Sequence, residues 1–314
     1  MIKNNPPRFL KKLFFKKWVI GICKGNIKDI IRRKEFDEEI CWLFKESIDR
    51  FFADPFPLAS KSDEQLKILC EEFEFQENYG KISLMTVDKN LKQVYYKTLL
   101  DTKSHLSYPF FFVENNKTYV FPEASMSGKL SCYQFCEKSE SLIFLKDIMN
   151  IRLLDSTILK YKSKYWIFGA LGDNTINYQL GIYYSDNLFG PYTPHACHGA
   201  YTGLDGIRSA GNFIEVDDVL YRPTQNCKKT YGESITINKV LALDENNYAE
   251  EPYFTISMNK KGRTNHGMNR IHTINSAANY IVVDGEHWVF SPYLQLKKFL
   301  FSKSKTKILN NIKR

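Results

Sequence analysis

The sequence lacks any long apolar run. No stretch of about 18 consecutive apolar residues occurs in its 314 residues, so it contains no candidate for a transmembrane helix. Glycine and proline number only 16 and 11, which excludes collagen-like and Pro/Gly-rich low-complexity chains. The seven cysteines are an odd number without regular spacing, so we expect reduced thiols and a cytoplasmic protein rather than a disulfide scaffold.

Acidic side chains are missing from both ends of the chain. Residues 1–20 carry six Lys or Arg and residues 297–314 carry seven, and neither segment contains Asp or Glu. The formal net charge of +9 therefore arises at the ends, while the remaining residues hold slightly more acidic than basic side chains. Because nucleic-acid binding needs basic residues on the domain itself, we expect no nucleic-acid partner.

The basic ends also carry apolar residues at helical spacings. Such segments bind the interface of anionic membranes, so we expect residues 1–18 and 297–314 to hold the protein on the inner face of a membrane. Two solvated tails are the alternative interpretation of the same pattern.

The body of the chain has a different texture from its start. Apolar spacings predict helices over residues 7–18 and within 26–52. From about residue 53 onward, short aromatic and β-branched runs alternate with polar turns, which is typical of an all-β domain. We therefore expect an N-terminal extension (1–49), a β domain (50–290) and a basic C-terminal tail (291–314).

One pattern recurs within the β domain: an apolar strand, a polar turn and a strand led by an aromatic residue. The tyrosines that open the second strand lie 46, 56 and 59 residues apart, and they are Tyr119, Tyr165, Tyr221 and Tyr280. Each interval suits one four-stranded unit, so the repeat predicts a β-propeller. A leading unit from residue 52 makes five blades, which we expect the strand 18–22 to close. An ordinary β-sandwich is the alternative.

The first strand of each propeller blade faces the central axis, so polar residues that open these strands converge. These positions hold Asp54, Tyr108, Asp155 and Arg208, and Glu233 begins the strand after the RPTQ turn. Glycosidic chemistry needs a carboxylate as base or nucleophile, a carboxylic acid to assist the leaving group, and a group that tunes their pKa values. We expect Asp54, Asp155 and Glu233 to supply these groups.

Several further residues are candidates for contact with a sugar-like, anionic ligand. Arg208 and Arg222 flank an apolar strand and can grip a phosphate or carboxylate, with Gln225 nearby. Pairing of these arginines with structural carboxylates is the alternative. Additional candidates for the same pocket are Glu123, His105, Tyr108 and His272.

No motif for a metal or cofactor is complete. His195, Cys197 and His198 resemble a zinc cluster, but no second ligand pair follows at the usual spacing. The glycine-containing segment 169–172 is not followed by the Lys-Ser/Thr pair of a phosphate loop. We therefore expect neither a metal nor a cofactor.

A resemblance to a known family rests on segments that occur in order along residues 50–290: ADPFP, SYPFFF…YVFPE, LLDST…YWIF, YYSD…GPYTPH, RSAG…LYRPTQNC and YGESI. They resemble the five-bladed propeller domain at the N-terminus of plant glucosamine inositolphosphorylceramide transferases, which is related to glycoside hydrolase families 43, 32 and 68. The resemblance implies that Asp54 is the base or nucleophile, Asp155 the stabilising carboxylate and Glu233 the general acid.

The resemblance leaves the activity open, because the plant proteins carry a separate C-terminal glycosyltransferase domain for which this chain has no room. Our first hypothesis is an enzyme of cell-surface polysaccharide or glycolipid synthesis. It would transfer sugar from an activated, phosphate-bearing donor to a carbohydrate or glycolipid acceptor. The alternatives are a family-43-like glycosidase and a non-catalytic, glycan-binding propeller.

Overall fold

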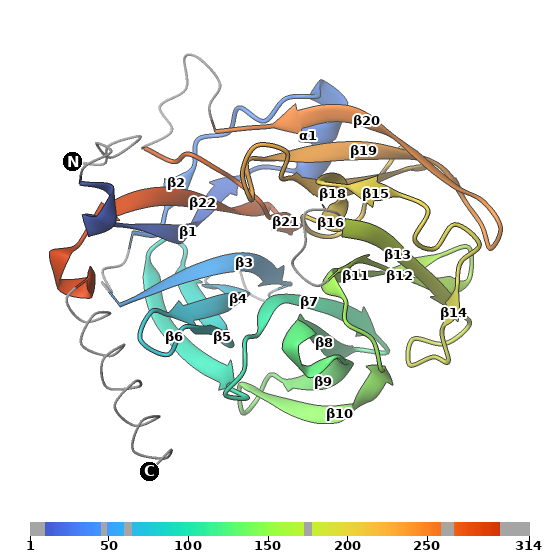
Figure 1. Cartoon of the computed structure of the whole chain (residues 1–314), viewed down its shortest axis with the longest axis horizontal. Helices are drawn as coiled ribbons and strands as arrows, with labels where there is room; N and C mark the ends of the chain where they lie inside the picture. The colour runs from blue at the N-terminus through green and yellow to red at the C-terminus, as the bar shows by residue number, and fades with distance from the viewer. Residues whose placement is uncertain (1–9, 45–48, 60–64, 173–177, 259–266, 296–314) are drawn as a thin grey trace, which may run out of the picture.

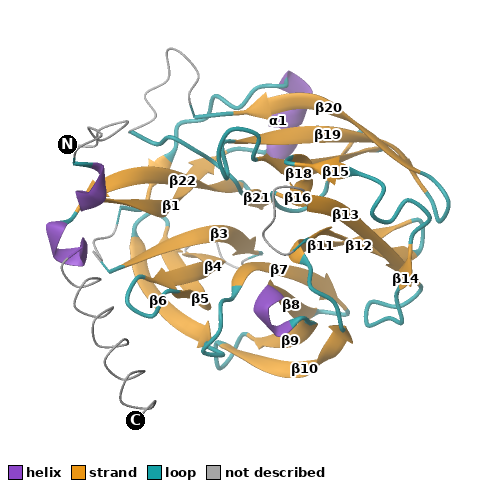
Figure 2. Cartoon of the chain, viewed as in Figure 1, coloured by secondary structure: helices purple, strands orange, loops and turns teal. Residues whose placement is uncertain are grey.

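The computed structural model describes residues 10–44, 49–59, 65–172, 178–258 and 267–295. Within these ranges the chain is built mainly from β-strands, as Figure 2 shows. Helical structure is limited to short pieces, among them α1 (Ile27–Arg33), η1 (Lys11–Leu13) and η2 (Ser125–Ser127). None of the helices in these ranges is long and apolar enough to span a membrane.

The strands form five antiparallel sheets around a common centre, as Figure 1 shows. This arrangement confirms the predicted five-bladed β-propeller. Four blades are consecutive in the chain, and each begins with its innermost strand. Blade 1 contains β3 (Arg50–Leu58), β4 (Gln65–Glu74), β5 (Tyr79–Asp88) and β6 (Gln93–Leu100). Blade 2 contains β7 (Ser107–Glu114), β8 (Lys117–Glu123), β9 (Leu130–Cys136) and β10 (Ser141–Met149).

The remaining blades follow the same order from the centre outward. Blade 3 contains β11 (Leu154–Tyr161), β12 (Lys164–Leu171), β13 (Tyr178–Ser185), β14 (Thr193–Pro194) and β15 (Thr202–Gly203). Blade 4 contains β16 (Asp205–Ser209), β17 (Ile214–Val216), β18 (Val219–Asn226), β19 (Ser234–Leu243) and β20 (Tyr248–Ile256). Blade 5 contains β21 (Ile274–Ala277), β22 (Tyr280–Phe290), β1 (Phe14–Lys24) and β2 (Cys41–Trp42).

The repeated sequence pattern corresponds to the inner hairpin of a blade. In β7–β8, β11–β12 and β17–β18, the two residues of the turn both have left-handed backbone, with φ between 47° and 63°. These turns are Asn115-Asn116, Lys162-Ser163 and Asp217-Asp218. Two-residue turns of this kind match the right-handed twist of the strands they join. The interval seen in the sequence is therefore the spacing from one inner hairpin to the next.

The ring is closed by a strand from the start of the chain. β1 pairs antiparallel with β22, from Phe14 opposite Phe290 to Lys24 opposite Tyr280. The two strands lie side by side in Figure 1, although they come from opposite ends of the sequence. This pairing confirms the expectation that the strand 18–22 completes the fifth blade.

The helix predicted over residues 7–18 is wrong in its described part, which forms η1 and then β1. Ile20 and Ile22 of β1 are buried in one apolar cluster, and Val19 and Cys23 are buried in another. Because both faces of β1 are covered, its apolar residues are continuous rather than alternating. Such a run does not distinguish a strand from a helix by its period.

The second predicted helix is much shorter than expected. Within residues 26–52, α1 is capped by the Asn26 side chain, which accepts the Lys28 N–H at 2.9 Å. It ends at Lys34, whose backbone is left-handed with φ 56°. The described residues that follow form β2 and the start of β3; Trp42 is buried there, whereas Phe44 is 46% exposed.

The centre of the ring is filled by polar contacts between inner strands. The buried Tyr108 hydroxyl accepts the Gly211 N–H at 2.8 Å and lies 3.0 Å from the Thr157 hydroxyl. Gly211 has φ +135°, and a Cβ there would lie 2.0 Å from the carbonyl oxygen of Ile274. The position therefore requires glycine both for its backbone and for the close approach of β21.

We predict that Gly211→Ala lowers the free energy of unfolding by roughly 2–5 kcal/mol, because it adds backbone strain and a clash with β21. Gly128→Ala is the matched control, since Gly128 also has positive φ, +70°, but open space around its Cβ position. The control should lose only about 1 kcal/mol. Urea denaturation measures both, and equal losses would contradict the packing argument.

Candidate active site

Three inner strands, β3, β7 and β11, each contain one residue with an unusual backbone. Asp54, Tyr108 and Asp155 have φ of 49°, 43° and 47°, although none is glycine. Each lies at a shift in the pairing register of its strand with the next strand of the blade. Left-handed backbone costs free energy in such residues and is concentrated at functional sites. The repeated distortion marks these positions as a candidate site.

A cavity of about 380 Å³ lies beside these inner strands. Its wall combines carboxyl groups, basic groups and aromatic rings. The carboxyl groups are Asp54, Glu71 and Glu123; the basic groups are His105, Arg152, Arg208 and His272; the rings are Trp18, Phe51, Phe73 and Tyr231. Polar groups converging on a cavity with aromatic walls are typical of a small-molecule site.

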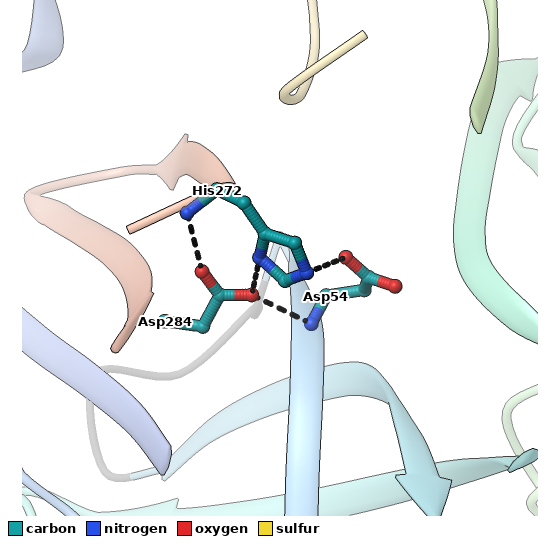
Figure 3. Close-up of side chains that lie close together, drawn as sticks. All are labelled: Asp54, His272 and Asp284. Atoms are coloured by element: carbon teal, nitrogen blue, oxygen red, sulfur yellow. Dashed lines mark hydrogen bonds and ion pairs between the residues drawn. The ribbon is translucent and has the colours of Figure 1, made fainter. Parts of the chain in front are cut away.

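Asp54 is held by a network that joins blade 1 to blade 5 (Figure 3). Its Oδ1 accepts the Thr273 hydroxyl at 2.8 Å, and its Oδ2 accepts the Tyr108 N–H at 3.1 Å. Its own N–H donates to Asp284 Oδ2 at 3.1 Å. Asp284 also contacts His272 Nδ1 at 2.6 Å, and His272 Nε2 lies 3.7 Å from Asp54 Oδ1.

Burial and neighbouring charges set the protonation of this network. Burial raises the pKa of Asp54 to about 6, while the positive charge of His272 opposes the rise. Burial disfavours a charged His272, but the carboxylates of Asp284 and Asp54 outweigh it and raise the pKa of the imidazole. At neutral pH this arrangement favours an ionised Asp54 beside a cationic His272.

Asp54, His272 and Asp284 could also be considered as metal ligands. Among the described residues, their possible ligand atoms all lie within 4.8 Å of one another, close enough to surround a cation. The N–H groups of Asp54, His272 and Thr273 donate to the Asp284 oxygens. A protonated imidazole has no lone pair for a metal. The donor set therefore fits a hydrogen-bonded network better than a metal centre.

Asp155 lies just behind the cavity wall, where the side chains of Arg208 and Gln225 both donate hydrogen bonds to it. Arg208 Nε donates to its Oδ2 at 2.5 Å, and Gln225 Nε2 donates to the same atom at 2.8 Å. The Asp155 N–H donates to Glu123 Oε2 at 2.9 Å. Burial raises the pKa of Glu123 to about 8, and the Asp155 charge adds to the rise.

A second buried acid faces a histidine across the cavity wall. Burial raises the pKa of Glu71 well above its usual range, and the Asp54 charge adds to this. His105 Nε2 lies 3.9 Å from Glu71 Oε1, and its Nδ1 accepts the Gly80 N–H at 2.9 Å. Burial lowers the pKa of His105, so the pair is a neutral acid beside a neutral imidazole.

The structure brings Asp54 and Asp155 to one site but places Glu233 elsewhere. Glu233 does not line the cavity, and its carboxylate lies 3.4 Å from Lys229 Nζ. The reason is the position of its strand: Glu233 precedes β19, which is the third strand of blade 4 rather than the innermost. The expected grouping of these three carboxylates is therefore corrected.

Three predicted ligand contacts are also corrected. Arg222 pairs with Glu250, with Nε donating to Oε2 at 2.9 Å, and does not line the cavity. Gln225 holds Asp155, and the Tyr108 side chain is fully buried at the ring centre. These residues support the site from behind. Predicted ligand residues that do line the cavity are Arg208, Glu123, His105 and His272.

Several cavity residues escaped the sequence analysis. Asp284 and Glu71 are buried acids within strands: Asp284 follows an apolar run (IVVD), and Glu71 is one of three glutamates in CEEFE. Trp18 stacks on the His272 ring with centroids 3.9 Å apart, and Tyr231 packs against both. Arg152 precedes β11, and its buried Nε has no hydrogen-bond partner among the described residues.

Comparison with known families decides where this propeller belongs. The family model of the glucosamine inositolphosphorylceramide transferase 1 N-terminal domain matches residues 45–289. The chain belongs to this family. The Arabidopsis thaliana transferase 1 is 33% identical over 200 residues, which cover 60% of this chain and 26% of that protein. The Oryza sativa subsp. japonica protein of the same name is 31% identical over 185 residues, covering 56% and 25%.

Membership in the glucosamine inositolphosphorylceramide transferase N-terminal family relates this propeller to transferases and to glycans. The chain spans about a quarter of the length of these curated relatives. The match to this one domain therefore does not assign the activity of the whole plant proteins to this chain.

Solved structures of glycoside hydrolases resemble this propeller in their fold. A family 117 glycoside hydrolase of Zobellia galactanivorans has a TM-score of 0.53 at 13% identity, covering 90% of this chain and 92% of that one. A family 43 glycoside hydrolase of Bacillus licheniformis has a TM-score of 0.51 at 13% identity, covering 70% and 49%. At these identities the likeness shows a shared fold alone.

We predict that Asp284→Asn lowers the free energy of unfolding by roughly 3–5 kcal/mol, because it leaves buried partners uncompensated. Because the pKa of His272 is raised, its protonated form stabilises the fold fully at pH values below the ordinary imidazole pKa of 6.5. This stabilisation is lost as pH rises through the raised pKa. The variant should lose less stability than the wild type over that rise. Thermal denaturation between pH 6 and 9 measures this, with exposed Glu215→Gln as control; parallel curves would contradict the network.

Proposed function

We propose that the protein catalyses glycosyl transfer in the synthesis of a cell-surface polysaccharide or glycolipid. A sugar donor would occupy the axial cavity, and a glycan or glycolipid hydroxyl would be the acceptor. The observation that carries the proposal is the convergence of Asp54 and the Asp155–Arg208 pair at one cavity of a family related to glycans.

The state of Asp54 supports its role as base or nucleophile. Its carboxylate lines the cavity, and a pKa of about 6 leaves it ionised at neutral pH but still basic enough to take a proton. Thr273 and the Tyr108 N–H fix both of its oxygens. A carboxylate held in one orientation loses little entropy when it attacks or deprotonates a bound group.

The aromatic rings support binding of a sugar. Trp18 and Tyr231 line the cavity on the His272 side, and Phe51 and Phe73 stack with centroids 4.9 Å apart on another part of the wall. Aromatic faces cover the apolar C–H face of a sugar ring, while neighbouring carboxyl groups bind its hydroxyls. The cavity offers both kinds of group within about 380 Å³.

The arginines give less support for a phosphate-bearing donor than the sequence indicated. The expected fork of Arg208 and Arg222 is not formed, because Arg222 is engaged by Glu250. Arg208 lines the cavity but is paired with Asp155, and it packs over the rings of Tyr178 and Tyr231. We therefore propose a sugar donor without assigning a phosphate to it.

Hydrolysis of a glycoside is a second candidate, and the buried carboxyl groups favour it. The same base and acid would serve if water replaced the acceptor hydroxyl. Release of free sugar from aryl glycosides in the absence of any acceptor would favour hydrolysis. Products longer than the substrate would favour transfer.

We predict that Asp54→Asn abolishes turnover, with a loss of at least about 100-fold in kcat, because the variant cannot take a proton or attack carbon. Asn keeps the size of the side chain, so the variant should fold. Asp218→Asn, in an exposed hairpin turn, is the matched control and should keep full activity. Circular dichroism verifies folding, and full activity of Asp54→Asn would refute the assignment.

Attachment to a membrane from the cytoplasmic side is part of the proposal. Two of the basic residues expected to contact lipid do not support this attachment, because Lys17 is buried and Lys16 pairs with Glu286 at 3.2 Å within blade 5. Residues 1–9 and 297–314 lie outside the described residues. The basic residues of these two segments, read from the sequence, are what supports binding to anionic lipid.

We predict that deletion of residues 297–314 releases the protein from liposomes containing anionic lipid. Each Lys or Arg near such a surface contributes about 1 kcal/mol, so loss of seven should be easily detected. Flotation in a density gradient measures this, with neutral liposomes as control. Unchanged flotation of the shortened protein would contradict membrane attachment through this segment.

A further inference from the structure

The cavity lacks the proton donor that the sequence assigned to it, because Glu233 lies outside. A departing glycosidic oxygen needs a proton, since an alkoxide is a poor leaving group. Two buried acids, Glu71 and Glu123, line the cavity with Asp54. Their contacts distinguish their roles.

Glu123 and Asp155 are buried neighbours: the Asp155 N–H donates to Glu123 Oε2 at 2.9 Å, and the Asp155 charge adds to the rise in the pKa of Glu123. Two neighbouring buried carboxyl groups favour a state in which they share one proton, because two adjacent negative charges repel. Arg208 and Gln225 both donate to Asp155 Oδ2, and these donors favour the negative charge on Asp155. The shared proton therefore resides on Glu123.

We propose that Glu123 is the proton donor of the reaction and that Asp155, with Arg208, keeps it protonated. The inference rests on the proposed glycosyl transfer and adds a residue to it. It also commits the donor to a class: the group that leaves is an alcohol or sugar oxygen of a glycoside, because a phosphate leaves without protonation.

The pKa values of the cavity agree with this division of roles. Burial raises the pKa of Glu123 to about 8, whereas that of Asp54 is about 6. Between these values Asp54 is ionised and Glu123 carries a proton. Pairs of acids whose environments separate their pKa values in this way identify the base and the acid of a site.

The proposed step balances as follows. The bond between the anomeric carbon and the leaving oxygen breaks, and that oxygen keeps the electron pair and takes the proton of Glu123. Asp54 either attacks the anomeric carbon or removes the proton of the incoming hydroxyl as its oxygen bonds to that carbon. If Asp54 has attacked, the incoming hydroxyl then displaces it from the anomeric carbon and gives its proton to Glu123, which restores both carboxyl groups. If Asp54 has acted as the base, it releases its proton to solvent and Glu123 takes one from solvent.

Glu71 is the rival proton donor. It is also buried with a raised pKa, but its partner is the neutral His105 rather than a carboxylate–arginine pair. The charges of Asp54, Glu123 and Asp155 add to the rise in the pKa of Glu71, but it is Glu123 that accepts the hydrogen bond of the Asp155 N–H. Glu71→Gln therefore serves as the comparison for Glu123→Gln.

The kinetic experiment uses aryl glycosides of several common sugars as probes, with phenol and 2,4-dinitrophenol as leaving groups. Glu123→Gln should slow cleavage of the phenyl glycoside by about 100-fold or more, and affect the dinitrophenyl glycoside much less, because that phenol leaves without a proton. The variant should also lose the fall in wild-type rate above pH 8. Exposed Glu137→Gln is the control for surface charge.

A second measurement reports the proton without activity. Because the pKa of Glu123 is about 8 in the fold and ordinarily 4.5, the folded state binds more protons and the wild type loses stability as pH rises between these values. Glu123→Gln has no such titration. Its melting temperature should rise by several degrees relative to wild type from pH 4.5 to 8.

The outcomes separate the two proposals. If the wild type turns over none of the probes or their acceptor mixtures, the proposed glycosyl transfer fails and the role of Glu123 fails with it. If the wild type is active and Glu123→Gln keeps the same leaving-group dependence and alkaline fall, only the role of Glu123 is overturned. The same holds if Glu71→Gln alone removes the alkaline fall, or if the melting difference does not change with pH.

Discussion

The antiparallel pairing of β1 with β22 is the constraint on which the rest of the structure depends. It unites the two ends of a ring of five blades and covers an edge of β22 that would otherwise be exposed. The same two strands bring Trp18 and Asp284 to His272, where Asp284 fixes the imidazole and Trp18 covers its face. Closing the ring and assembling this side of the cavity are therefore one structural event.

Electrostatic pairing on the two sides of the cavity explains how so many acids are tolerated at the ring centre. On one side His272 lies between the carboxylates of Asp54 and Asp284. On the other, Arg208 neutralises Asp155, and Glu123 keeps its proton. A buried charge without a partner would cost several kcal/mol, so each acid either faces a cation or remains protonated. This division would supply the base and the acid of the proposed glycosyl transfer at neutral pH.

Much of the fold and part of the site could be predicted from the sequence. The inner hairpins repeat because each needs the same apolar strands and tight turn, and their first residues face the axis, so Asp54 and Asp155 were placed together. Glu233 was misplaced because nothing local shows that β19 is the third strand of its blade. Arg222 was taken for a ligand contact because its partner, Glu250, lies on another strand of the blade. Asp284 was missed because a single acid after an apolar run has no distinctive pattern, and Glu71 because nothing local distinguishes it from the neighbouring Glu72 and Glu74.

The sequence by itself determined the number of blades, the inner hairpins and the placement of two aspartates, Asp54 and Asp155, on inner strands. These follow from local patterns of apolar residues and turns, which recur within each blade. Only the tertiary structure decided that residues 14–24 are a strand, which groups line the cavity and where its protons reside. The physical reason is distance along the chain: the Asp54 N–H meets a carboxylate 230 residues away, and burial by remote segments raises the pKa values of Asp54, Glu71 and Glu123.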